Sequence, residues 1–107
     1  MGDAFEQRED GFEKRFVLDE TLRFRALARR NKALGLWAAD LLGRRGDAAE
    51  AYAAALAAGQ VERDDEALAA DLAIQFADAG VDMSAHRIQR KMTETMAEAM
   101  ASVRAGR

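Results

Sequence analysis

The sequence predicts an all-α protein, a four-helix bundle with a mobile N-terminal segment. Proline is absent from the 107 residues, and alanine and other helix-forming residues dominate the composition. β-Branched residues are scarce, which disfavours a β-sheet. Apolar residues recur at helical spacing in stretches that are separated by glycines and capping residues, which predicts several helices packed in a small bundle.

Residues 1–19, which we call the N-terminal segment, interleave acidic and basic residues with a few large apolar ones. Phe5, Phe12 and Phe16 fall at i, i+7 and i+11, so these positions share one helical face. Gly11 interrupts the segment at a cost of about 1 kcal/mol, so the isolated segment is expected to be frayed. Burying three phenylalanines on a small bundle would not offset the cost of ordering the backbone. We therefore expect an external partner to cover them.

Residues 20–107 are expected to form the bundle, beginning with a helix over 20–42 that ends near Gly43. The C-terminal half of this helix carries a broad apolar stripe. Trp37 is the largest side chain of the stripe and is expected to be mostly buried. The stripe consists of Leu34, Trp37, Ala38, Leu41 and Leu42.

Three shorter helices are predicted to follow, over 47–58, 65–79 and 84–103. The second helix is almost all alanine, so its backbone is expected to lie close to its neighbours. Only a few residues separate consecutive predicted helices, and such short connections favour antiparallel packing of neighbouring helices. Capping side chains mark the helix N-termini, and these are Asp47, Asp64 or Asp65, and Ser84.

Methionines recur along the fourth predicted helix, at Met92, Met96 and Met100. Such a stripe is typical either of a filled core or of a pliable binding groove. Core filling is the interpretation that we favour.

No catalytic chemistry is indicated. The sequence has no phosphate-binding glycine motif and no nucleophile beside a base. His86 is the one histidine, and with Asp82 it would supply too few ligands for zinc. The absence of cysteine excludes disulfides, and no apolar run approaches the ~20 residues that cross a bilayer. We expect a soluble cytoplasmic protein that is not an enzyme, holds no metal or cofactor and does not insert into the membrane.

A run of cations precedes the apolar stripe. Residues 21–46 hold seven basic residues and one acidic residue, a net charge of +6 in a chain whose total is −3. One interpretation is a helical module that binds nucleotide or nucleic acid through this patch. The acidic pI of 5.2 and the lack of interleaved aromatic residues disfavour DNA, so we prefer a protein partner. This basic run comprises Arg23, Arg25, Arg29, Arg30 and Lys32.

Two separated segments resemble the zeta inhibitor subunit of alphaproteobacterial F-type ATP synthases. Residues 12–43 contain TLRF, ARRNK and GLWAA in the order of that family, and residues 79–92, AGVDMSAHRIQRKM, follow its G-V-D-x-S-x-H-x-I-x-R-K-M pattern. The resemblance implies a four-helix bundle with a mobile N-terminal segment. It also implies that this segment becomes helical inside a catalytic interface of the ATPase head and there blocks rotation in the direction of ATP hydrolysis.

The partner implied by the resemblance is the catalytic head of F-type ATP synthase. Through this enzyme the protein would lie at the inner membrane without entering it, and we expect it to be monomeric when free. Carried over by position, the inhibitory contacts would be the apolar anchors Phe5, Phe12 and Phe16 and the polar residues Arg8, Lys14 and Arg15.

Overall fold

The computed structural model describes the backbone of residues 2–59 and 64–107, and the side chains of residues 20–59 and 64–107. Within these ranges the chain is helical and contains no β-strand, which confirms the predicted all-α class. Its helices are α1 (Gly2–Leu41), α2 (Asp47–Gly59), α3 (Asp65–Asp78) and α4 (Ala85–Arg104).

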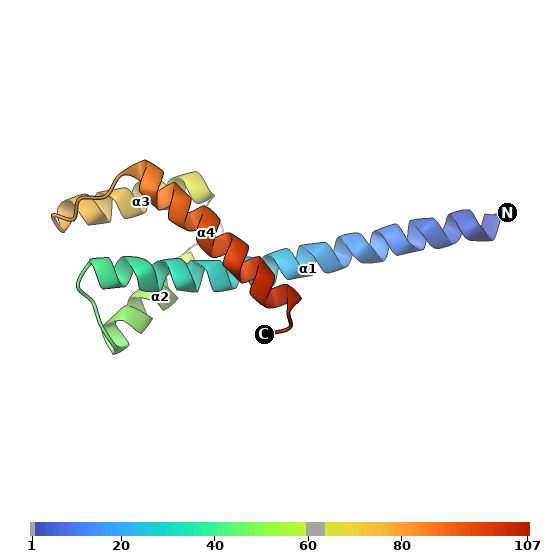
Figure 1. Ribbon diagram of the computed structural model, residues 1–107, viewed down its shortest axis with the longest axis horizontal. Helices are drawn as coiled ribbons and strands as arrows, with labels where there is room; N and C mark the ends of the chain where they lie inside the picture. Colours follow the sequence, from blue (N-terminus) through green and yellow to red (C-terminus); the bar gives the residue numbers. More distant parts are fainter. Residues whose placement is uncertain (1, 60–63) are drawn as a thin grey trace.

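α1 is the central helix of the molecule. Its C-terminal half packs against α2 and α4, and α3 packs against α4, which crosses α1 near its middle (Figure 1). The N-terminal half of α1 projects away from the other three helices (Figure 1). The molecule is therefore elongated, with dimensions of 66 × 26 × 21 Å.

The start of α1 differs from the prediction. A helix was expected from residue 20, whereas the observed helix begins at Gly2 and continues without a break to Leu41. Gly11 weakens a helix by only about 1 kcal/mol, and no proline interrupts this stretch. A separate unit over 1–19, distinct from 20–107, and the mobility of that unit remain predictions.

The predicted capping residues organise the starts of α3 and α4. The carboxylate of Asp64 accepts a hydrogen bond from the Ala67 N–H at 2.7 Å. The hydroxyl of Ser84 accepts one from the Arg87 N–H at 3.1 Å. Each bond satisfies a backbone donor that the first helical turn leaves without a partner. α2 differs slightly, because Asp47 is its first helical residue.

The core lies where α1, α3 and α4 meet. Trp37 lies at its edge, with its ring 5.6 Å from that of Phe76 at an interplanar angle of 75°. Lys91 covers part of the ring from outside, with Nζ 6.0 Å from the centroid, and most of Trp37 is buried, as predicted. The buried core consists of Leu34, Ala38, Leu68, Ala69, Leu72, Phe76, Ile88 and Met92.

α1 and α2 approach each other closely at Gly35. A Cβ atom at this position would lie 2.7 Å from the Cα of Ala53, which is fully buried. The prediction that small side chains let α2 lie close to its neighbours is confirmed. α2 also reaches α3, because the Tyr52 hydroxyl hydrogen-bonds to the Gln75 side chain.

Candidate partner-binding surface of helix α1

α1 carries both sets of contact residues predicted from the sequence. The side chains of Phe5, Arg8, Phe12, Lys14, Arg15 and Phe16 lie outside the described residues, while the backbone at these positions is helical. Because the helix is continuous, the positions of the three phenylalanines share one face. The geometry thus places the predicted anchors on the part of α1 that projects from the bundle (Figure 1).

The basic run is distributed around α1 and does not form one surface. Arg23 and Arg25 are exposed. Arg29 donates a hydrogen bond from Nη1 to the hydroxyl of Ser102 on α4, at 2.7 Å. Lys32 points toward α2, with its Nζ 3.8 Å from the carboxylate of Glu50, and both groups are exposed. Arg29 and Lys32 therefore each contact a neighbouring helix of the bundle.

Arg30 is a structural residue of the bundle. Its side chain is only 2% exposed, and its Nη1 and Nη2 donate hydrogen bonds to the carboxylate of Asp65 at 3.0 and 2.7 Å. Its Nε donates to the side-chain oxygen of Asn31 at 2.8 Å. This planar, two-bond geometry ties the first turn of α3 to the C-terminal half of α1.

The ion pair is asymmetric in burial, since the Asp65 side chain remains 60% exposed. The hydrogen bonds from Arg30 lower the pKa of Asp65 below its ordinary value of 3.8, although partial burial opposes this shift. The positive charges of Arg30 and Arg23 lower the pKa further. Asp65 is consequently ionised at neutral pH, and the link between α1 and α3 is intact.

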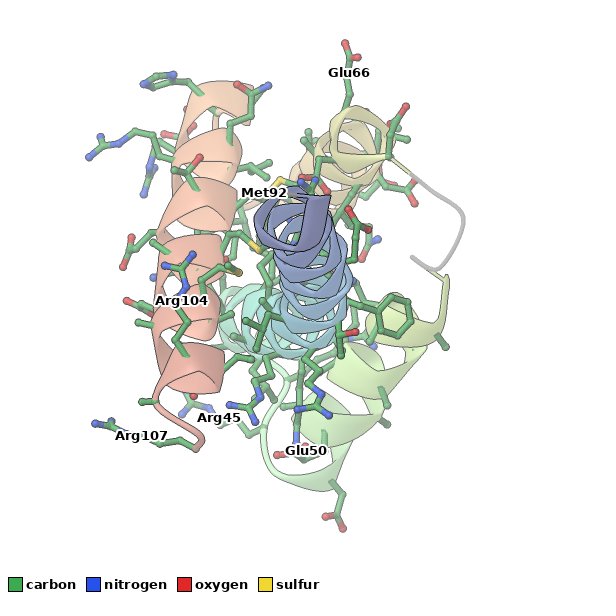
Figure 2. The ribbon with its side chains drawn as sticks, turned by 90° about the vertical axis from the view of Figure 1, so that its right-hand side faces the viewer. Arg45, Glu50, Glu66, Met92, Arg104 and Arg107 are labelled. Atoms are coloured by element: carbon green, nitrogen blue, oxygen red, sulfur yellow. The ribbon has the colours of Figure 1, made fainter. Side chains whose placement is uncertain are left out.

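A groove of about 530 Å³ lies beside this ion pair, between α1, α3 and α4; we call it the methionine groove. Met92 reaches from α4 into the space between the helices, while Glu66 points outward from α3 (Figure 2). Met92 is buried in the core, whereas Met96 and Met100 are half-buried. All three methionines line this groove, and the interpretation as core filling is correct for the buried Met92, whereas Met96 and Met100 are only partly covered by the bundle. The lining consists of Arg23, Leu27, Arg30, Asp65, Glu66, Gln89, Met92, Thr93, Met96, Ala97 and Met100.

Sequence reasoning missed the burial of Arg30 and its pairing with Asp65. A signal for it was present, because Arg30 lies four residues after Ala26 and four before Leu34, and both are fully buried. An arginine on such a helical face requires a carboxylate partner. The burial of Arg30 was overlooked because Arg30 was interpreted as one of the exposed cations of the basic run.

The described residues offer no catalytic arrangement. His86 is exposed on α4. Among the side chains that the structure describes, no three histidine, aspartate or glutamate residues form a group suited to a metal ion. Across the same residues, no helix is both long enough and apolar enough to cross a membrane. The arrangement is suited to binding through helical surfaces.

Comparison with known proteins identifies a family. The model of the family described as ATPase inhibitor subunit zeta matches residues 1–102. The match includes the N-terminal segment and nearly all of α4. A comparison with curated proteins finds no match.

Proposed function

Because the chain belongs to the ATPase inhibitor subunit zeta family, we propose that its N-terminal segment inserts as a helix into a catalytic interface of the ATP synthase head. Membership of this family implies a non-catalytic regulator that inhibits ATP hydrolysis by F-type ATP synthase. The observation that supports insertion is the continuity of α1, whose N-terminal half projects beyond the other helices (Figure 1). Insertion of this half is sterically compatible with a bundle that stays outside.

The N-terminal segment has dimensions suited to wedging between protein domains. A helix over residues 2–19 is about 27 Å long at ~1.5 Å per residue. Phe5, Phe12 and Phe16 would contribute apolar contacts along one face, each of which is worth about 1.5–3 kcal/mol when fully buried. Arg8, Lys14 and Arg15 would pair with carboxylates or carbonyls of the partner. A rigid helix held in this way opposes the closing and opening of a catalytic interface.

The alternative, binding of nucleotide or nucleic acid through the basic run, receives no specific support from the contacts. Such a site needs several cations converging on one phosphate. Arg30 instead pairs with Asp65, Arg29 with Ser102, and Lys32 lies beside Glu50. We therefore expect no tight polyanion binding.

Deletion of residues 1–18 tests the proposal. The described core begins at Leu22 and Ala26, so we expect the truncated chain to keep its helical circular dichroism spectrum and a thermal midpoint within a few degrees of the full chain. We expect it to lose inhibition of ATP hydrolysis by a cognate ATPase. A truncated chain that inhibits as well as the full chain, or that unfolds, would contradict the proposal.

The expected assembly state is a monomer that joins ATP synthase. Sedimentation of the free protein checks the first part. Co-purification of tagged protein with ATPase subunits from a membrane extract, and its loss on deletion of residues 1–18, checks the second.

A further inference from the structure

Apolar residues recur at a spacing of eleven residues along one face of α1. Phe5, Phe16, Leu27 and Ala38 follow one another at this spacing. Eleven residues make about three helical turns, so these four positions share a face of a continuous helix. At its C-terminal end the face is core, because Ala38 is fully buried.

Phe12, Arg23 and Leu34 form a second row at the same spacing, on the same side of α1. Leu34 is fully buried, whereas Arg23 is exposed. Both rows therefore end in the core, and between the phenylalanine positions and the core they pass through the half-buried Leu27 and the exposed Arg23.

The methionine groove lies beside the middle residues of these two rows. Arg23 and Leu27 contribute its α1 side, and Met96 and Met100 contribute its α4 side. Leu27, Met96 and Met100 are all half-buried, so their apolar surface is only partly covered by the bundle. The groove thus lies in line with the phenylalanine positions, with the exposed Glu20 and Arg23 on the same side of α1 between Phe16 and Leu27.

We propose that the methionine groove is a second docking site for the ATP synthase head. An amphipathic helical segment of the head that covers the phenylalanine face would extend into the groove, with apolar side chains on the methionines and a carboxylate at Arg23. Flexible thioether side chains adapt to such an apolar insert. This inference rests on the proposed function, because it extends the same interface from the N-terminal segment to the bundle.

The continuity of α1 argues against the chain's own N-terminal segment as the occupant. Phe5, Phe16 and Leu27 lie in line on one helix, so the segment cannot reach the groove without breaking α1 between them. A second copy is also disfavoured. Of the large apolar side chains described, the most exposed are Phe24 at 73% and Ile74 at 60%, which lie on different helices and form no ridge that would fill a groove.

The first experiment introduces a charge into the groove of the full chain. In Met96→Glu the new carboxylate would face the apolar insert, and we expect the concentration for half-inhibition of ATP hydrolysis to rise about tenfold or more. Ile74→Glu makes the same charge change on exposed α3 and should inhibit like the wild type. Thermal unfolding of each variant checks the fold. Met96→Gln, which introduces a polar group without a charge, provides a milder second variant.

The second experiment uses the absence of cysteine in the chain. A full-length Met96→Cys variant labelled with a benzophenone maleimide should photo-crosslink to a subunit of the ATPase head, and an equally labelled Ile74→Cys variant should not. The crosslink reports contact directly, so its result does not depend on the stability of the charged variant.

The outcomes separate the two proposals. If the wild type does not inhibit, the proposed function fails. If the wild type inhibits, while Met96→Glu inhibits equally well and Met96→Cys gives no crosslink, the groove inference alone fails. Stronger inhibition by Met96→Glu would indicate that the groove holds the N-terminal segment. If the wild type sediments as a dimer and Met96→Glu as a monomer, while both inhibit equally, the groove holds a second copy of the chain. Either of these two results would overturn the inference.

Discussion

The buried guanidinium of Arg30 donates two hydrogen bonds to the solvent-facing carboxylate of Asp65, which lies 35 residues further along the chain. This contact joins the C-terminal half of α1 to the first turn of α3 and borders the methionine groove. It makes an arginine of the basic run part of the fold, and it leads to the first two predictions.

Asp65→Ala should destabilise the protein more than Arg30→Met. Removing Asp65 leaves a buried guanidinium with one remaining side-chain partner, which should lower the free energy of unfolding by about 2–3 kcal/mol. Arg30→Met replaces the guanidinium by an apolar side chain and leaves Asp65 exposed to water, so the loss should be smaller. The helix cap is unaffected in both, because Asp64 provides it. Urea unfolding measures the difference, and a larger loss in Arg30→Met would contradict this assignment.

The contribution of Asp65 should depend on pH. Its pKa is lower in the folded protein than its ordinary value of 3.8, so the folded state binds a proton less readily than the unfolded state. The stabilisation is therefore fully present above about pH 4 and disappears as the pH falls through the lowered pKa. Thermal midpoints of the wild type and of Asp65→Asn should differ most near neutral pH and converge in acid. A constant difference down to strong acid would exclude this linkage.

Gly35→Ala should be destabilising although alanine is the better helix former. The gain in helix propensity is about 1 kcal/mol, but the new Cβ would lie 2.7 Å from the backbone of Ala53. Separating α1 from α2 should give a net loss of about 1–3 kcal/mol. Gly59→Ala is the matched control, because a Cβ there has no neighbour within 4 Å. Thermal unfolding should show a lower midpoint for the first variant and an unchanged or higher one for the second.

Phe76→Ala should lower the free energy of unfolding much more than Phe24→Ala, because Phe76 lies in the core and Phe24 on the surface. Phe76 is fully buried and packs edge-on against Trp37, so its truncation should lower the free energy of unfolding by about 3–5 kcal/mol. Phe24 is 73% exposed, and its truncation should change stability by less than about 0.5 kcal/mol. Chemical unfolding followed by Trp37 fluorescence measures both. Equal effects would show that the core is placed incorrectly.

The double substitution of Phe12 and Phe16 by alanine should weaken inhibition and leave the fold intact. Removing two anchors from one face should lower the binding free energy by several kcal/mol, at about 1.5–3 kcal/mol for each side chain. Inhibition of ATP hydrolysis as a function of protein concentration measures the loss, and circular dichroism checks the fold. Unchanged inhibition would show that the partner does not bury this face.

The sequence was sufficient to predict the bundle because its helix signals are local. Asp64 and Ser84 cap the helices to which they were assigned, and α3 ends at Asp78, within one residue of the predicted 79. The pairing of Arg30 with Asp65 depends on the long-range arrangement of α1 and α3, which no local pattern specifies. The sequence offered both core filling and a groove for the methionine stripe, and it could not decide between them because Leu27 and Met96 come from helices whose crossing no local pattern specifies.

In the proposed complex the unbroken course of α1 would also set the depth and the rotational phase at which the N-terminal segment meets its partner. One residue inserted near Glu20 would turn the phenylalanine face by about 100°, whereas eleven would restore the phase and move the face outward by about 16 Å. The shorter dimensions of the molecule, 26 and 21 Å, exceed the ~10–12 Å diameter of a single helix. In the proposed insertion the bundle would therefore be too wide to follow α1 into a cleft of helical width, and it would stop entry at a fixed distance from the tip.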